Sequence, residues 1–249
     1  MKQLARLAAF AAVAAFAVLF VSCGVEEHYY LPQLPDGNIR REFNTEAVIT
    51  IPPISDQFYY AGYYAIFYRI YISDIPISSQ ITQSDMSLIS PSLAVDYNAF
   101  HSLTDPTNTS SITSSQTFRN RNYFELELEG VDIKSKLSTS GGTLRIFFST
   151  AGDPPVAVFN DEPQVNLIRP YYSNQLISPE PRGIPYFINT PQLRNIEYAN
   201  SNSNADVAGR TGTPGEAYVS MYIVAVGTNP GNFTPIYSKP THISVFRLF

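Results

Sequence analysis

Residues 63–72 read YYAIFYRIYI, and this stretch decides the fold of the chain. Its aromatic and β-branched side chains suit the pleated surface of a β-strand. Successive side chains of a strand point to opposite faces, and here both sets are apolar or aromatic except for Arg69. Because a strand that is apolar on both faces is covered on both sides, we expect it at the centre of the fold. Gly62 and Asp74 mark its two ends.

Similar segments surround this strand and are separated by proline and glycine. Strands are predicted at residues 47–51, 144–148, 156–159, 217–226 and 241–248. Residues 122–130 alternate, which predicts a half-buried strand with Phe124, Leu126 and Leu128 inward and Glu125, Glu127 and Glu129 outward.

One helix is predicted after Ser90, with Pro91 at its first position and apolar residues at 93, 97, 100 and 103. Two polar stretches, residues 104–117 and 200–213, are predicted loops. At least eight strands, one or two short helices and no βαβ rhythm predict an all-β, antiparallel β-sandwich.

The composition limits the classes of partner. The chain has 249 residues, with 16 Lys and Arg against 21 Asp and Glu, a net charge of −5. Without residues 1–22, which hold Lys2 and Arg6, the balance becomes 14 − 21 = −7. An acidic chain lacks the clustered cations that bind phosphate backbones, so no nucleic-acid partner is expected.

The N-terminus predicts export. Lys2 and Arg6 precede an uncharged apolar run at residues 7–21, which is shorter than the ~20 residues of a spanning helix and is typical of a cleaved signal peptide over residues 1–22. Residues 19–23, Leu-Phe-Val-Ser-Cys, resemble the lipobox of bacterial lipoproteins, with Phe20 in place of the usual Leu. Relaxed boxes of this kind resemble those of spirochaetal lipoproteins.

The lipobox resemblance implies that Cys23 carries diacylglycerol and palmitate-type acyl chains as the new N-terminus. Residues 23–30 would then be a short tether, and residues 31–249 the sandwich domain, in the cell envelope at the outer membrane. Cys23 is the only cysteine, so the chain can form no internal disulfide and no thiolate metal site.

A second resemblance concerns the sandwich. Residues 62–70 resemble the third strand of a fibronectin type III domain, an immunoglobulin-like sandwich, and residues 213–218, 222–227 and 237–240 resemble its last two strands. The resemblance implies a tyrosine corner at Tyr218. Two features depart from it: Ala225 is out of phase with Tyr218, which requires a bulge or no true corner, and residues 75–212 imply a large insertion or a subdomain.

No motif for catalysis or cofactor binding is present, so no catalytic residue, cofactor or metal site is predicted. His28, His101 and His242 are far apart in the sequence. The acidic group of Glu125, Glu127, Glu129 and Asp132 could hold a hard cation if a loop supplied more oxygens, but is interpreted as a solvated strand face.

Tyrosines are dense at residues 59–71, and they either pack on both sheet faces or form an exposed recognition patch. The candidate protein-binding residues are Tyr63, Phe67 and Tyr71, on the face opposite the expected core. We therefore expect a lipid-anchored, non-catalytic binding or structural module, with an envelope or host protein as partner. The alternatives are a hydrolase of envelope polymers and a lipoprotein that binds a solute or metal.

Overall fold

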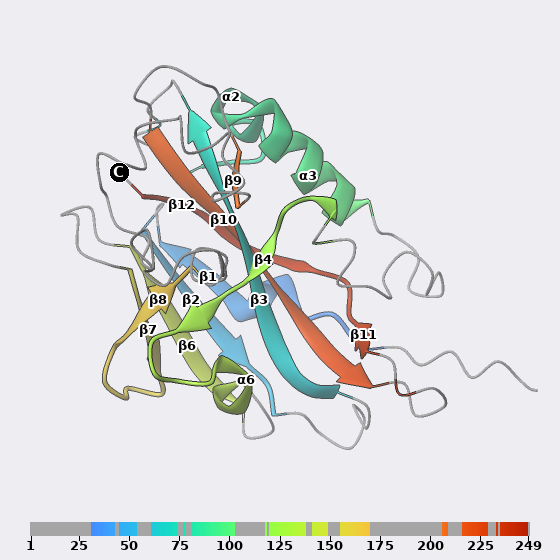
Figure 1. Cartoon of the computed structure of the whole chain (residues 1–249), viewed down its shortest axis with the longest axis vertical. Helices are drawn as coiled ribbons and strands as arrows, with labels where there is room; N and C mark the ends of the chain where they lie inside the picture. Colours follow the sequence, from blue (N-terminus) through green and yellow to red (C-terminus); the bar gives the residue numbers. More distant parts are fainter. Residues whose placement is uncertain are drawn as a thin grey trace, which may run out of the picture.

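The computed structural model describes residues 31–42, 45–53, 61–73, 77, 81–102, 118, 120–137, 141–148, 155–169, 206–208, 216–228, 233 and 235–248. These residues form two β-sheets that pack face to face and a helical layer that covers the outer face of the second sheet (Figure 1). The predicted all-β antiparallel sandwich is confirmed.

The first sheet has six strands in the order β1-β2-β6-β7-β8-β5. Their bounds are β1 Ile39–Glu42, β2 Glu46–Ile51, β6 Gly142–Phe147, β7 Val156–Phe159, β8 Val165–Ile168 and β5 Glu127–Leu128. All pairings between them are antiparallel. A 3-10 turn, η1 Asp36–Asn38, precedes β1.

The second sheet is built on two thirteen-residue strands, β3 Ala61–Ser73 and β10 Glu216–Thr228, which pair antiparallel along almost their whole length. On the far side of β10 lie β11 Pro235–Tyr237 and β12 Thr241–Arg247. On the far side of β3 lie β4 Phe124–Glu125 and, in parallel, β9 Val207–Ala208.

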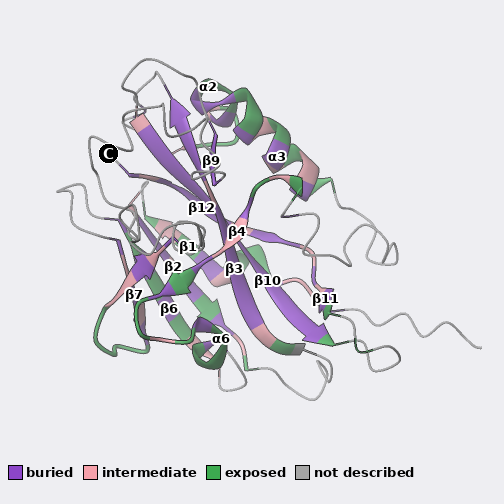
Figure 2. Cartoon of the chain, in the orientation of Figure 1, coloured by how far each residue is buried: buried purple, intermediate pink, exposed green. Residues whose placement is uncertain are grey.

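The central strand expected at residues 63–72 is buried on both faces because two cores meet on it (Figure 2). Its residues Tyr64, Ile66, Tyr68, Ile70 and Ile72 face the first sheet and form the inter-sheet core with alternate residues of β10. The opposite face packs against the helical layer, which comprises α2 Met86–Ile89 and α3 Pro91–His101. The predicted helix is confirmed, with Pro91 in its first turn.

Residues 122–130 are not one continuous strand. The segment pairs with β3 in the second sheet as β4 and then with β8 in the first sheet as β5. The break falls at Leu126, which stays buried while its amide donates to the carbonyl of Ile66 over 2.7 Å. The inward positions of Leu126 and Leu128 are confirmed, and the segment links the two sheets. The short helix α6 Ile133–Lys136 follows it.

Residues 75–212 were expected to be a large insertion or a subdomain. Their described parts supply β5 to β8 of the first sheet and β4 and β9 of the second. All residues of β6 align with β2, so this segment forms part of the first sheet.

A buried ion pair joins the end of β8 to the start of β9. Arg169 and Asp206 are 2% and 0% exposed, and the guanidinium donates to both carboxylate oxygens over 2.8 and 2.6 Å. The hydroxyl of Tyr68 donates to the same carboxylate over 2.9 Å. Loss of either partner would leave an unpaired buried charge, so the pair holds both segments in place against β3.

Tyr218, expected at a tyrosine corner, lies on the helix-covered face of β10, and Ala225 lies on the opposite face. Alternation along β10 is therefore unbroken between them, and its register with β3 is continuous there. The pairing with β12 shifts register between Met221 and Tyr222, where Ile243 of β12 has no opposite residue. The hydroxyl of Tyr218 accepts a hydrogen bond from the amide of Ile77 over 2.8 Å. Among the residues described, no helix is long and apolar enough to cross a membrane.

Candidate functional site

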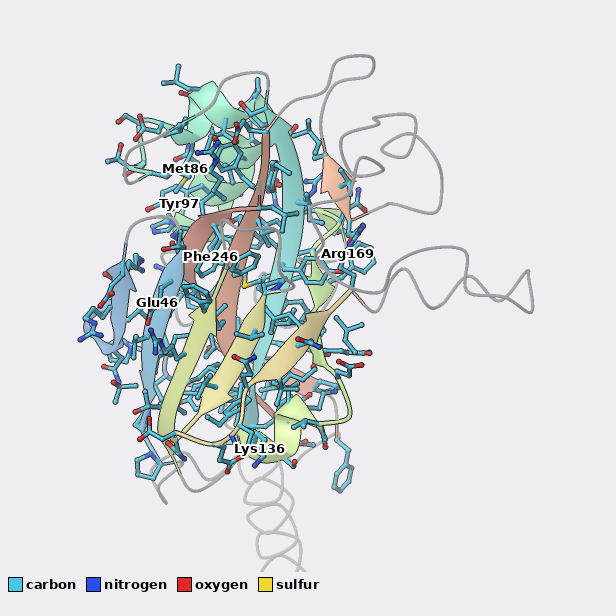
Figure 3. The ribbon with its side chains drawn as sticks, turned by 90° about the vertical axis from the view of Figure 1, so that its left-hand side faces the viewer. Glu46, Met86, Tyr97, Lys136, Arg169 and Phe246 are labelled. Atoms are coloured by element: carbon cyan, nitrogen blue, oxygen red, sulfur yellow. The ribbon has the colours of Figure 1, made fainter. Side chains whose placement is uncertain are left out.

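The outer face of the first sheet carries a groove of about 500 Å³. The groove is lined by side chains of four neighbouring strands and the turn after β7: Arg40, Glu42, Glu46, Val48, Thr143, Arg145, Val158, Asn160 and Asp161. Figure 3 looks onto this side of the molecule, with Glu46 labelled on β2. Among the described residues, the helical layer packs on the second sheet and does not cover this groove.

Strand register explains why these residues meet. Arg40 pairs with Val48, Val48 with Arg145, and Arg145 with Val158, so the four form one row across β1, β2, β6 and β7. Directly opposed side chains on one face of a sheet lie about 5 Å apart. The row therefore alternates guanidinium and valine, and it offers a ligand both charge and apolar contact.

Each guanidinium of the row has a carboxylate partner within the groove. Arg145 donates through Nε and Nη2 to both oxygens of Glu46, with 2.9 Å between Nη2 and Oε2. This hydrogen bonding raises the pKa of Arg145. Arg40 lies 3.0 Å from Glu42. A guanidinium has five N–H donors, and the pair with Glu46 uses two of those of Arg145. Each arginine of the row therefore has donors that its carboxylate partner does not use.

The structure places the candidate residues Tyr63, Phe67 and Tyr71 elsewhere. Phe67 and Tyr71 are 5% and 0% exposed, and the Phe67 ring stacks on Phe118 at 4.1 Å between centroids. The expectation of an exposed aromatic face is wrong for these two residues, because α2 and α3 cover it. Tyr63 is half-buried, with the ammonium of Lys134 5.1 Å from its ring centroid.

Asp96 of α3 is the centre of a buried polar network beneath the helical layer. Its carboxylate accepts from Arg69 over 2.7 Å, from the Tyr71 hydroxyl over 2.6 Å and from Arg121 over 2.8 Å. The Tyr71 hydroxyl lies 3.0 Å from that of Tyr123. Burial, and then neighbouring negative charge, raise the pKa of Tyr71 well above its ordinary value. The network holds α3 on β3 and carries no group exposed as a nucleophile.

His101 and His242 meet around Tyr97, although 141 residues separate them in the sequence. The Tyr97 ring stacks on His101 at 3.8 Å and meets His242 edge-on at 5.3 Å. Nε2 of His242 is buried, with no hydrogen-bond partner in the described part of the chain. Burial, and then the charge of Arg41, lower the pKa of His242 to about 3.

Three of the four carboxylates in the acidic group near β5 have protein partners. Glu125 lies 3.3 Å from Lys134, Glu129 accepts from Asn166 over 2.7 Å, and Asp132 caps α6 by accepting from the amide of Lys134 over 3.0 Å. Within the described ranges, no group of three or more His, Cys, Asp or Glu is placed to hold a metal ion.

Cys23 and His28 lie outside the described residues. The groove was not predicted from the sequence, although Thr143 and Arg145, at alternate positions of β6, are polar and exposed on this face. Comparison of the chain with protein-family models, curated proteins and solved structures finds no match.

Proposed function

We propose that this protein is a lipid-anchored lipoprotein of the bacterial cell envelope that binds a protein partner without catalysis. Cys23 carries the acyl anchor, and the open face of the first sheet carries the binding site. The observation that carries this proposal is the row Arg40, Val48, Arg145 and Val158, which combines charged and apolar groups in an open groove. Arginine is enriched at protein interfaces, where one side chain offers both charge and contact area.

We also propose that the sandwich is related to the fibronectin type III domain. The described parts of the segments with that resemblance fall in β3, in β10 and at the end of β11, and these strands are neighbours in one sheet in this order. This is the arrangement that the resemblance implies for the third and the last two strands.

The anchor is tested by intact-mass analysis of protein from native membranes and by cell fractionation. We expect an N-terminus at Cys23 with added acyl mass, and release from membranes or stalled processing for Cys23→Ala. Since each buried methylene contributes about 0.8 kcal/mol, two or three acyl chains anchor a protein stably. An unmodified cysteine in the native protein would refute the anchor.

The binding face is tested by cross-linking capture on intact cells with Arg145→Ala and the matched control Arg247→Ala. Both substitutions remove an arginine that donates through Nε and Nη2 to one glutamate, Glu46 in the groove and Glu216 in the second sheet. We expect capture to fall by about tenfold for Arg145→Ala alone, as for an interface residue worth ~1.4 kcal/mol. Equal capture by both variants would place the binding site elsewhere.

A further inference from the structure

The outer face of the first sheet carries two parallel rows of side chains (Figure 3). Strands β1, β2, β6 and β7 each turn two alternate residues away from the inter-sheet core. The first row is Arg40, Val48, Arg145 and Val158. The second row, in the same order of strands, is Glu42, Glu46, Phe147 and Val156. The two rows lie about 6.8 Å apart along the strands.

The two rows complement each other on three of the four strands. On β1 a cation, Arg40, lies two residues from an anion, Glu42. On β6 the guanidinium of Arg145 precedes Phe147, an aromatic residue that is 39% exposed. On β7 both outward residues are half-buried valines. Opposite charges attract, and a guanidinium is attracted to the face of an aromatic ring, so this face is complementary to itself.

We infer that the partner bound by this face is a second copy of the chain, related to the first by a two-fold axis that lies across the strands, between the two rows. The inference rests on the proposed function, which assigns protein binding to this face. Such an axis sets the first row of each copy against the second row of the other, so every contact occurs twice. The pairs that meet are Arg40 with Glu42, Arg145 with Phe147, and Val158 with Val156.

The remaining strand is compatible with this arrangement. On β2, Val48 faces Glu46 of the second copy, and that carboxylate stays paired with the Arg145 of its own chain. An axis along the strands, midway between β2 and β6, is less favourable because it sets both charges of β1 against the valines of β7. The pattern of the face therefore favours the axis across the strands.

The charge of the face also favours a second copy. The two rows hold two arginines and two glutamates, so their charges sum to zero, whereas the whole chain carries −5. Two copies with the same net negative charge repel each other through the rest of their charges. A neutral, self-complementary face is where two such copies approach at the lowest electrostatic cost.

A charge swap on β1 distinguishes a second copy from any other partner. Arg40→Glu and Glu42→Arg each set like charges against each other at two places in the dimer. The double variant Arg40→Glu/Glu42→Arg restores the pair within each chain and both pairs between the copies. The two side chains are 71% and 46% exposed, so the fold tolerates these changes, which far-UV circular dichroism verifies.

Sedimentation equilibrium of the full mature chain in density-matched detergent measures the dissociation constant of the dimer. We expect the natural protein to dimerise, each single variant to raise the dissociation constant by at least about tenfold, and the double variant to recover the natural value. Phe147→Ser should weaken the dimer by a similar factor. Leu88→Ser, at a residue that is 56% exposed on α2, is the matched control and should leave it unchanged.

A natural protein that stays monomeric up to about 1 mM, the effective concentration of tethered partners, would overturn the inference. The proposed function would still stand if Arg145→Ala lowered capture on cells. A dimer that none of these substitutions weakens would have its interface elsewhere, which also overturns the inference. So would single variants that lose the dimer without recovery in the double variant, because contact between Arg40 and Glu42 of different copies requires that recovery.

Discussion

Asp96 shows how one carboxylate couples a helix to a sheet. It is 4% exposed and accepts hydrogen bonds from Arg69, Tyr71 and Arg121. Removal of one partner from a buried ionic network leaves the remaining charges unpaired in a poorly solvated site. Asp96 therefore contributes to stability mainly by accepting hydrogen bonds from these three side chains.

We expect Asp96→Ala to lower the free energy of unfolding by about 3 to 5 kcal/mol, because two guanidinium groups lose their carboxylate. Glu42→Ala is the control, since it breaks only the exposed pair with Arg40 and should cost less than ~1 kcal/mol. Urea unfolding of the two variants measures the difference. Similar costs would show that Asp96 contributes no more than a surface charge.

His242 makes stability depend on pH. The pKa of this residue is about 3 in the folded chain, against an ordinary value of ~6.5 when unfolded. Between these values the unfolded chain binds a proton that the folded chain excludes. The free energy of unfolding therefore falls as pH falls from ~6.5 toward ~3, by at most about 1.4 kcal/mol per pH unit.

We expect His242→Phe, which keeps an aromatic ring beside Tyr97 and Tyr222, to lose less stability than the natural protein between about pH 7 and pH 5. Urea unfolding at the two pH values provides the measurement. His101→Gln retains His242 but removes a second histidine whose pKa is lowered by burial, so it should reduce the loss by less than His242→Phe does. Identical losses in His242→Phe and the natural protein would assign the acid sensitivity to other groups.

At the scale of elements, β3 is a strand that two cores share. Ile70 faces the first sheet, and Phe67 faces the helical layer. We expect Ile70→Ala to cost about 2 to 5 kcal/mol and Phe67→Ala about 3 to 5 kcal/mol, because both leave cavities. Leu88→Ala, at a residue that is 56% exposed on α2, should stay within ~0.5 kcal/mol. A neutral Phe67→Ala in the same unfolding measurement would mean that α2 and α3 do not cover β3 in solution.

At the scale of the whole molecule, β3 and β10 make the two cores interdependent. Each strand contributes alternate residues to both, so the helical layer cannot lose its sheet without loss of the sandwich. We expect one cooperative transition, with coincident curves for tyrosine near-UV circular dichroism and for far-UV circular dichroism. Because Tyr71, Tyr123, Tyr218 and Tyr222 lie beneath the helices, curves that do not coincide, or that show two steps, would mean that one layer unfolds independently of the other.

The sequence was informative where the signal is local. The double-faced pattern at residues 63–72, the proline after Ser90 and the apolar run at 217–226 predicted β3, α3 and β10. The burial of the candidate residues and the position of the groove, in contrast, depend on contacts between segments that are distant in the sequence. The burial of Phe67 requires α2 and α3, and the groove requires Arg145 to align with Val48, 97 residues earlier. No pattern within one segment encodes such a register.

Arg41 has a consequence for contacts between copies of the chain. Its guanidinium donates to the backbone carbonyls of Ile243 and His242 over 2.7 and 2.5 Å, at the start of β12. Among the strands described, β12 pairs only with β10, so these two carbonyls would otherwise be open to strand addition. A side chain that already occupies these acceptors therefore keeps neighbouring copies of the chain from joining their sheets there.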